Sequence, residues 1–295
     1  MRYTKHFRSM LFTPATAVDR YRRCHQSSAD ICVVDLEDSV AAADKEIARR
    51  DAAMFFSAPS AAARRCAVRV NAVTEPDGLR DLVALLDYEV RPNIVVVPKA
   101  ESARDVEIVE QVLGGGRADL EICAVIETPR GLENALSIAE ASESLRALIF
   151  GAADYSFAVG ARRTWECLLS ARARVVNSAR AANIEAVDSP VFEFADLDAL
   201  RWEAPLSKDL GFSGKAAIHP GQVPVINDAF SPDADVLALA QRIVTAGKAN
   251  GRAVTSVDGV MAGRPFFDAA QRLLDEFEPP AESASRSAGK GEAWA

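Results

Sequence analysis

Short apolar runs recur along the chain, and segments with helical spacing separate them. Most runs are apolar throughout instead of alternating with polar residues, which is typical of strands that are buried on both faces of a sheet. The runs lie at residues 10–12, 31–36, 66–70, 94–98, 121–127, 147–151, 184–188 and 216–218. Helical spacing marks segments 19–28, 44–56 and 164–183, and the last of these is the clearest amphipathic helix.

This alternation of strand and helix predicts right-handed βαβ units and a parallel sheet. Eight such units within residues 1–230 fit a closed (β/α)₈ barrel of the α/β class, the TIM barrel. A doubly wound open sheet is the alternative architecture.

After the eighth run the pattern changes. A helical segment at 233–250 is followed by a turn at 256–265 and by a last helix that ends near residue 277. We therefore expect a C-terminal helical extension, or lid, over residues 231–277. Residues 278–295 are rich in Pro, Ser, Ala and Gly without apolar periodicity, so we expect a disordered tail there.

The charge balance narrows the class of partner. The 295 residues include 34 Lys and Arg against 42 Asp and Glu, a formal net charge of −8. Such an acidic chain is a poor match for nucleic acid or an anionic membrane, whereas a small anion needs only a few local cations. No apolar run approaches the length of a membrane span, about 18 residues. Residues 1–12 lack the apolar stretch of a signal peptide, and the five cysteines include no C-x-x-C pair, which together indicate a cytoplasmic protein.

Polar side chains follow the predicted strands at their carboxyl ends, where the active sites of parallel barrels lie. Most of them are carboxylates, namely Asp35, Glu37, Asp38, Glu127, Asp154 and Asp188. Carboxylates gathered at one rim repel one another, and an oxygen-liganded Mg²⁺ would relieve that repulsion. The three histidines are too scattered for a three-histidine zinc site.

Several of the polar residues at the strand ends have more than one possible role. Arg69 lies inside an apolar run and needs a polar partner, for which a substrate carboxylate is a natural choice. Lys99 could form a Schiff base in a metal-free aldolase, although the carboxylate set favours a metal. Asp38 and Asp188 could instead cap a helix or pair with a cation, and His219 is more typical of a packed rim histidine than of a catalyst.

Seven ordered segments make the pattern specific. They are RSMLFTPA (8–15), VVDLEDSVAAADK (33–45), VRVN (68–71), VVPKAES (96–102), AVIETPRGLENA (124–135), LIFGAADYSFAVG (148–160) and GFSGKAAIHPGQV (211–223). Together they resemble the citrate lyase beta subunit-like family of the HpcH/HpaI aldolase/citrate lyase superfamily, which includes malyl-CoA and citramalyl-CoA lyases. The resemblance implies a TIM barrel that assembles as a homotrimer or hexamer.

The resemblance also implies a set of site residues. Mg²⁺ would be held by Glu127 and Asp154. Arg69 would bind the carboxylate or keto oxygen of a 2-oxo acid. Glu37 and Asp38 match acidic residues that hold metal-bound waters and, with Arg69, form the expected catalytic set.

The resemblance places coenzyme A near the first strand–helix loop, so Phe12 and Arg23 are its expected contacts. Two positions depart from the family pattern. Ala17 stands where related malyl-CoA lyases carry a phosphate-binding arginine. Gly263 stands where the family commonly has an aspartate that acts as an acid or base in a neighbouring subunit's active site, and Asp258 is nearby in sequence.

These features predict a Mg²⁺-dependent carbon–carbon lyase. It would cleave a 3-hydroxyacyl-CoA of the citramalyl-CoA or malyl-CoA type to acetyl-CoA and a 2-oxo acid (pyruvate, glyoxylate or oxaloacetate) by retro-aldol chemistry. The alternatives are an acyl-CoA thioesterase or synthase of the same fold, a citryl-carrier-protein lyase subunit of a complex, and a metal-dependent aldolase of free 2-oxo acids.

Overall fold

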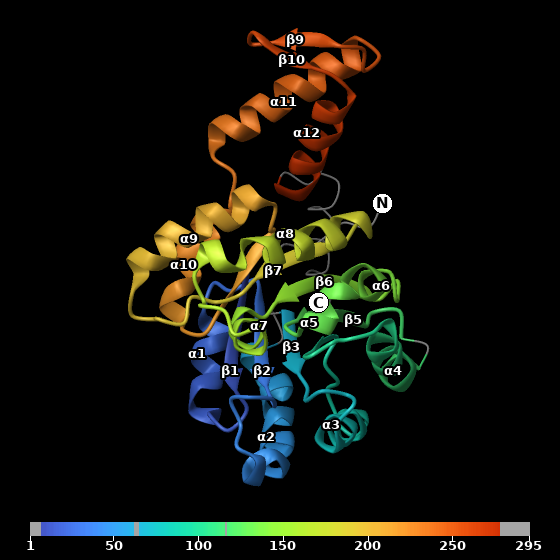
Figure 1. The fold of residues 1–295 in the computed structure, drawn as a ribbon, viewed down its shortest axis with the longest axis vertical. Helices are drawn as coiled ribbons and strands as arrows, with labels where there is room; N and C mark the ends of the chain where they lie inside the picture. The colour runs from blue at the N-terminus through green and yellow to red at the C-terminus, as the bar shows by residue number, and fades with distance from the viewer. Residues whose placement is uncertain (1–6, 62–64, 116, 278–295) are drawn as a thin grey trace, which may run out of the picture. The chain divides into compact units, whose positions relative to one another are not determined.

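The computed structural model describes residues 7–61, 65–115 and 117–277 (Figure 1). It divides into two compact units, one formed by Phe7–Phe230 and the other by the described residues from Ser231 onward. The predicted disorder of residues 278–295 concerns a segment outside the described residues. None of the helices in the described ranges is long and apolar enough to cross a bilayer.

The first unit is a closed barrel of eight parallel strands in sequence order, with β8 pairing back to β1. The strands are β1 (Ser9–Pro14), β2 (Ile31–Asp35), β3 (Arg65–Arg69), β4 (Ile94–Val97), β5 (Glu121–Ile126), β6 (Leu145–Phe150), β7 (Glu185–Asp188) and β8 (Gly214–Ala217). Each predicted apolar run contributes one strand. The prediction of a (β/α)₈ barrel is confirmed, and the alternative of an open sheet is wrong because β1 and β8 close the ring.

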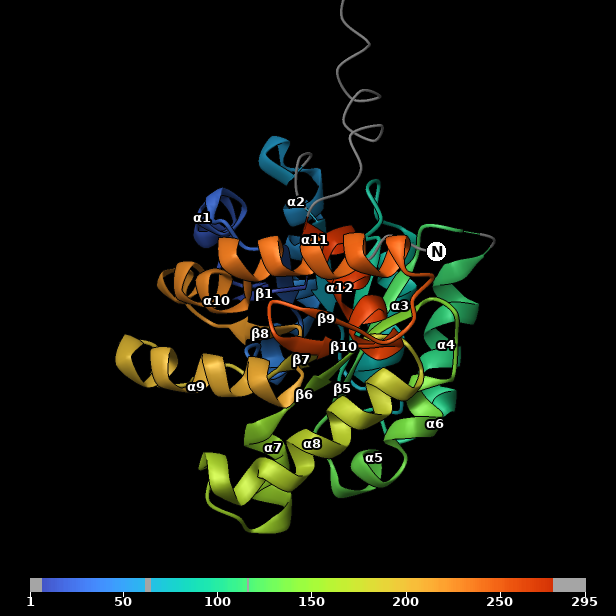
Figure 2. The ribbon, with the colours of Figure 1, turned by 90° about the horizontal axis from the view of Figure 1, so that it is seen from above.

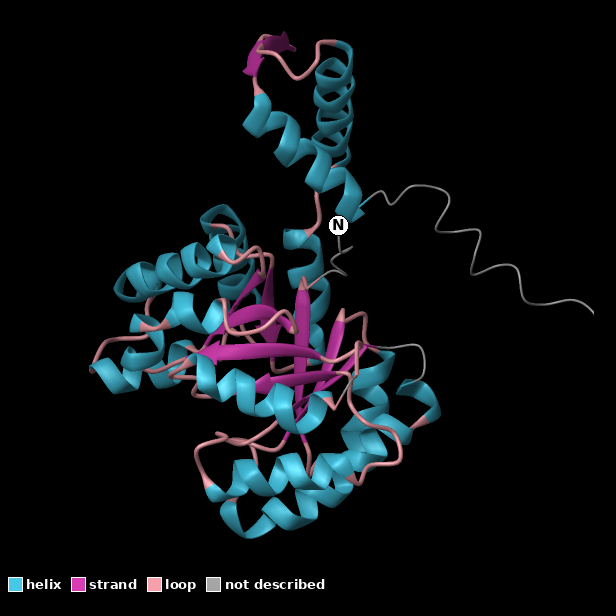
Figure 3. Ribbon diagram, turned by 90° about the vertical axis from the view of Figure 1, so that its right-hand side faces the viewer, coloured by secondary structure: helices cyan, strands magenta, loops and turns pink. Residues whose placement is uncertain are grey.

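Helices surround the strands on the outside of the barrel (Figures 2 and 3). The α-helices are α1 (Tyr21–Gln26), α2 (Lys45–Ser57), α3 (Pro76–Leu86), α4 (Ala103–Gly114), α5 (Pro129–Glu133), α6 (Ala135–Ala139), α7 (Ala152–Val159), α8 (Trp165–Ala181), α9 (Leu197–Leu210) and α10 (Val223–Phe230). Short 3₁₀ helices are η1 (Val18–Arg20), η2 (Ala42–Asp44), η3 (Pro59–Ala61) and η4 (Pro220–Gln222).

Most strand positions are apolar because both faces of the strands are buried. On β2, Val33 belongs to the cluster that fills the barrel interior, whereas its neighbour Val34 packs in the layer between strands and helices. Both side chains have no exposed surface. Successive side chains of a strand point to opposite faces, so burial of both faces removes the alternation that a half-exposed strand would show.

The strand register sets polar residues from neighbouring strands beside one another at the carboxyl end of the barrel. Asp35 pairs with Arg69 across β2 and β3. Ile126 pairs with Phe150 across β5 and β6, which places Glu127 beside Gly151. These pairings bring together residues from four strands that the sequence separates.

Asp188, the carboxylate at the end of β7, is not an exposed acid at the rim of the barrel. Asp188 is fully buried and receives Nζ of Lys215 at 2.7 Å, Nε of Arg172 at 3.0 Å and the hydroxyl of Ser207 at 2.6 Å. Lys215 also contacts Glu203 at 2.6 Å. Asp188 therefore has the alternative role considered from the sequence, that of an ion-pair partner.

The second unit contains α11 (Ala234–Ala249), β9 (Thr255–Val257), β10 (Val260–Ala262) and α12 (Arg264–Phe277). The segment expected to be a simple turn at 256–265 is instead an antiparallel hairpin followed by the start of α12. Asp258 and Gly259 form its two-residue turn with φ of 52° and 82°, the geometry that Asp-Gly favours in tight hairpins.

Candidate active site

A cavity of about 330 Å³ lies at the carboxyl end of the barrel strands. Six of the residues identified from the sequence line it, namely Phe12, Asp35, Asp38, Arg69, Glu127 and Asp154. Its wall also contains apolar side chains from the barrel interior, which are considered further below. The cavity therefore collects side chains from the ends of β1, β2, β3, β5 and β6.

Arg69 is the central cation of the cavity, and two carboxylates hold it in place. Its Nε and Nη2 donate to the two oxygens of Asp35 at 2.6 and 2.7 Å, and Nη1 lies 2.9 Å from Oε2 of Glu37. The ring of Phe12 lies 5.3 Å from the guanidinium carbon. Burial alone would raise the pKa of Asp35, but the charge and hydrogen bonds of Arg69 outweigh it and lower that pKa. Both groups are therefore ionised at neutral pH.

The assignment of Asp35 as the main partner of Arg69 was missed from the sequence. The sequence marks Asp35 as a strand-end carboxylate but gives it no specific role, because the family resemblance assigns functions to Glu37 and Asp38. The available signal was the register of β2 and β3, which sets Asp35 directly opposite Arg69. Asp35 accepts the N–H of Nε and one N–H of Nη2, and Nη1 forms an ion pair with Glu37, so N–H groups of Nη1 and Nη2 remain for one further carboxylate.

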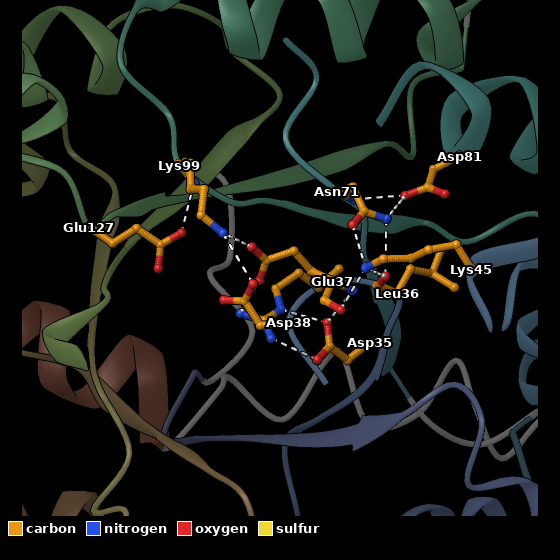
Figure 4. Close-up of polar contacts among 10 residues, drawn as sticks. Asp35, Leu36, Glu37, Asp38, Lys45, Asn71, Asp81, Lys99 and Glu127 are labelled. Carbon is orange, nitrogen blue, oxygen red and sulfur yellow. Dashed lines mark hydrogen bonds and ion pairs between the residues drawn. The ribbon is translucent and has the colours of Figure 1, made fainter. Parts of the chain in front are cut away.

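Lys99 links the acidic loop after β2 to the carboxylate after β5 (Figure 4). Its ammonium contacts Glu37 and lies 3.3 Å from Oδ1 of Asp38. Its backbone N–H donates to Oε1 of Glu127 at 2.8 Å, with Lys99 in the left-handed region at φ 50°. Burial would lower the pKa of Lys99, but Glu37 and Asp38 raise it, so the amine stays protonated. A protonated amine is no nucleophile, which argues against the Schiff-base alternative.

Glu127 is a buried carboxylate in an electrostatically unfavourable position. Burial first, and then the charges of Glu37 and Asp154, raise its pKa to about 8. Its carboxylate fits closely against Gly151, where an added Cβ would lie 2.4 Å from Oε2 of Glu127. Asp154 lies in the first turn of α7 and lines the same cavity.

These residues fit a magnesium ion. Glu127 and Asp154 face one cavity, and their mutual repulsion is the kind that a divalent cation relieves. Within the described ranges no three His, Cys, Asp or Glu side chains converge into a complete protein cage. Mg²⁺ commonly takes one or two carboxylates and keeps its other positions for water and substrate oxygens, so a two-carboxylate site suits it.

A hydrogen-bonded layer behind the cavity fixes the loop that carries Glu37 (Figure 4). Nζ of Lys45 donates to the carbonyls of Leu36 and Glu37 at 2.7 and 2.8 Å and to Oδ1 of Asn71 at 2.6 Å. Asn71 in turn donates through its backbone and side chain to Asp81, both at 2.7 Å. The backbone on either side of Leu36 is thereby held against β3.

A second cavity, of about 490 Å³, adjoins the first and shares Phe12, Thr13, Pro14, Arg20 and Ile218 with it. Arg23, the other expected coenzyme A contact, lines this second cavity and not the first.

His219 lies at the rim of the second cavity. Its Nδ1 accepts the N–H of Gly221 at 3.1 Å, and its ring stacks on Phe194 with centroids 5.4 Å apart. These contacts agree with the interpretation of His219 as a packed rim histidine.

Gly263 and Asp258 lie in the second unit. Asp258 is the first residue of the hairpin turn and accepts a hydrogen bond from Nε of Arg242 at 2.8 Å. Gly263 directly precedes α12 and brings no ionisable side chain.

Sequence comparison places these features in a known family. Residues 8–220 match the HpcH/HpaI aldolase/citrate lyase family. Citrate lyase subunit beta of Escherichia coli (strain K12) is 33% identical over 289 residues, which cover 94% of this chain and 95% of that protein. The L-malyl-CoA/beta-methylmalyl-CoA lyase of Rhodobacter capsulatus is 31% identical over 303 residues, which cover 92% and 94% of the two chains.

Solved structures agree. RipC from Yersinia pestis shares 40% identity at a TM-score of 0.68, over 79% of this chain and 98% of that chain. CitE from Mycobacterium tuberculosis in complex with magnesium, acetoacetate and coenzyme A shares 30% identity at a TM-score of 0.74, over 91% and 97%. Further structures from that organism hold oxaloacetate and magnesium, or magnesium and pyruvate. Because the family match and these relatives span most of its length, the chain belongs to the HpcH/HpaI aldolase/citrate lyase family of carbon–carbon oxo-acid lyases that act on CoA thioesters.

Proposed function

We propose that this protein cleaves a 3-hydroxyacyl-CoA of the citramalyl-CoA or malyl-CoA type into acetyl-CoA and a 2-oxo acid. The observation that carries the proposal is the joint placement of Arg69, Glu127 and Asp154 in one cavity that adjoins a second cavity. The first cavity suits a small oxo acid, and the second suits the longer coenzyme A portion next to Phe12 and Arg23.

Arg69 binds the carboxylate or keto oxygen of the acid half, using the N–H groups that Asp35 and Glu37 leave free. Its fixed position means that little side-chain entropy is lost when substrate binds. Glu37, held by Arg69 and Lys99, and Asp38, at the cavity wall, orient water beside the substrate.

Glu127 and Asp154 would hold Mg²⁺, which supplies Lewis-acid activation of the substrate hydroxyl when bound. In the cleavage the hydroxyl passes its proton to the water that Glu37 and Asp38 orient and becomes the carbonyl of the 2-oxo acid. The carbon–carbon bond breaks, its electrons pass to the thioester as an enolate, and the same water returns the proton, which converts that enolate to acetyl-CoA. Arg69 stabilises negative charge at the acid half throughout.

The test uses the purified full chain with MgCl₂, acetyl-CoA or propionyl-CoA, and pyruvate, glyoxylate or oxaloacetate. Mass spectrometry of the products identifies both halves of the condensation product. We expect a 3-hydroxyacyl-CoA from at least one pair, and at least a 100-fold loss of turnover in Glu127→Gln, because the buried ligand charge is removed. Wild-type turnover by Glu127→Gln would contradict the metal assignment.

A second candidate is the beta subunit of a citrate-lyase-type complex that acts on a carrier-bound thioester. The observation in its favour is the match to citrate lyase subunit beta of Escherichia coli over 94% of this chain. Turnover of free CoA thioesters by the isolated chain would contradict it. Gly263 makes a thioesterase or synthase a weaker candidate, because the resemblance assigns that position an acid–base aspartate in those reactions.

Assembly and location are part of the same proposal. We expect a homotrimer or hexamer, as the family resemblance implies, and a cytoplasmic location, as the cysteine pattern and the N-terminal residues indicate. Multi-angle light scattering of the purified chain measures the oligomer mass, and a monomer at all concentrations would contradict the assembly.

A further inference from the structure

The floor of the active-site cavity consists of apolar side chains from the barrel interior. Val125 on β5, Ile149 on β6 and Ala216 on β8 line the cavity, and each is at least nine-tenths buried. Val125 and Ile149 belong to the cluster that fills the barrel, and Phe12 packs against the same cluster. These three side chains offer van der Waals contact and no hydrogen bond, although the buried hydroxyl residue Ser189 lines the same cavity.

None of the three side chains that form this floor carries a charge. Among the described residues that line the cavity, the cationic ones are Arg69 and Arg20. Arg69 is already held by Asp35 and Glu37 and keeps donors for one carboxylate. Arg20 is exposed in the first strand–helix loop and also lines the adjoining cavity, so it lies at the mouth. A second carboxylate directed at the floor would lose its water without gaining a cation.

The geometry of the substrate carbon then decides what faces the floor; this step rests on the proposed function. The carbon that becomes the keto carbon is tetrahedral before cleavage and carries four groups. Its carboxylate points to Arg69, and its hydroxyl points to Glu127 and Asp154. Its acyl arm must leave through the mouth to reach the coenzyme A portion. The fourth group, the substituent of the 2-oxo acid, is left to face Val125, Ile149 and Ala216.

We infer that Val125, Ile149 and Ala216 select a 2-oxo acid whose substituent is small and uncharged, and that they discriminate against one with a second carboxylate. Glyoxylate and pyruvate satisfy this requirement, whereas oxaloacetate would place a carboxylate on the apolar floor. Methyl-sized differences in such a pocket change selectivity about 10- to 200-fold, so the floor also limits the length of the substituent.

Binding tests the inference independently of turnover. Isothermal titration calorimetry of the full chain in MgCl₂ compares glyoxylate, pyruvate, 2-oxobutyrate and fresh oxaloacetate, without any CoA thioester. We expect oxaloacetate to bind at least tenfold more weakly than pyruvate. Equal or tighter binding of oxaloacetate would overturn the inference, as would absence of binding by all four acids.

A matched pair of variants locates the selectivity at the floor. Ile149→Val enlarges the floor, whereas Ile218→Val makes the same change beside the mouth, where Ile218 lines both cavities. We expect Ile149→Val to raise the affinity ratio of 2-oxobutyrate to pyruvate about tenfold, a methyl-sized effect, and Ile218→Val to leave that ratio unchanged. Equal changes in both variants would show that the floor does not set selectivity.

The opposite change is Ala216→Leu, which fills the floor. We expect this variant to weaken the binding of pyruvate about tenfold relative to that of glyoxylate, which has only a hydrogen at that position. Thermal denaturation checks that each variant is folded. If the acids bind in the expected order but no condensation product forms, the inference about the floor holds and the proposed function is contradicted. If condensation occurs with oxaloacetate as the preferred acid, lyase activity is supported and the inference about the floor is contradicted.

Discussion

At the scale of single residues, the proposed substrate site is built around one guanidinium, that of Arg69, which two carboxylates hold in place. Asp35 binds Nε and Nη2 along one edge of the Arg69 guanidinium, and Glu37 pairs with Nη1. A planar guanidinium can satisfy both carboxylates and still bind an oxo acid, whereas a lysine ammonium has a single nitrogen. The identity of this residue as arginine therefore matters beyond its charge.

Arg69→Lys should lower kcat/KM at least 100-fold, since the bidentate contact with Asp35 and the free N–H groups are both lost. Steady-state kinetics in the cleavage direction measure the effect. Arg65→Lys is the matched control, because Arg65 begins the same strand and pairs with Glu121 at 2.7 Å, away from the cavity. Comparable losses in both variants would mean that the effect of Arg69→Lys is general to the strand.

Gly151 allows the carboxylate of Glu127 its position, because an added Cβ would lie 2.4 Å from Oε2. Gly151→Ala should therefore displace Glu127 and weaken Mg²⁺ binding about 10- to 100-fold, the range found when the support of a metal ligand is lost. Calorimetric titration with MgCl₂ measures it. In Gly114→Ala, the nearest atom to the new Cβ is 3.7 Å away, so Mg²⁺ affinity should not change. An unchanged affinity in Gly151→Ala would contradict the assignment of Glu127 as a ligand.

At the scale of elements, a buried ionic network joins two strands to two helices. Asp188 on β7 contacts Lys215 on β8, Arg172 on α8 and Ser207 on α9. Burial alone would raise the pKa of Asp188, but Lys215 and Arg172 outweigh it and lower that pKa. The network thus fixes the outer layer behind β7 and β8 without entering the cavity.

Asp188→Asn should lower the free energy of unfolding by about 3–5 kcal/mol, because it leaves two buried cations without their carboxylate. Urea unfolding at neutral pH measures the change. Asp119→Asn breaks an exposed pair with Arg117 and should cost less than about 1 kcal/mol. A loss in Asp188→Asn no larger than in Asp119→Asn would contradict this account of the network.

The same network predicts a dependence of stability on pH. The folded pKa of Asp188 lies below its unfolded value of about 3.9, so its contribution is fully present above that pH. The contribution is lost as the pH falls through the folded pKa. Urea unfolding between pH 7 and pH 3 should therefore show that the free energy of unfolding falls less with decreasing pH in Asp188→Asn than in the wild type. Parallel pH profiles would contradict the lowered pKa.

At the scale of the whole molecule, the barrel and the C-terminal unit have separate apolar cores. The barrel buries its own interior and outer layers, whereas the second unit packs Val257, Ala262 and Phe267 in a small cluster. Glu127 and Asp154 both belong to the barrel. The candidate metal site is therefore formed without any residue of the second unit.

A chain that ends at Phe230 should fold with a cooperative thermal transition and retain Mg²⁺ binding within about threefold of the full chain, because its core is complete. Circular dichroism and calorimetric titration measure both properties. Loss of the cooperative transition would show that the barrel depends on the second unit for stability. A folded barrel without Mg²⁺ binding would contradict the placement of the metal ligands.

Strand and helix order could be predicted because each βα unit carries its own local pattern. Runs such as 31–36 and 94–98 are apolar throughout, and both became strands buried on two faces. The hairpin at Thr255–Ala262 was not predicted, since its strands are three residues each and too short to show a period. Asp258-Gly259 was the available signal.

The sequence by itself determined the barrel, and it placed Arg69, Glu127 and Asp154 at strand ends that meet at one rim. Tertiary structure alone decided which carboxylates serve which cation, because pairing depends on register and burial between strands. For this reason Asp35 pairs with Arg69, whereas Asp188, which is also a strand-end acid, pairs with Lys215 and Arg172 in the outer layer.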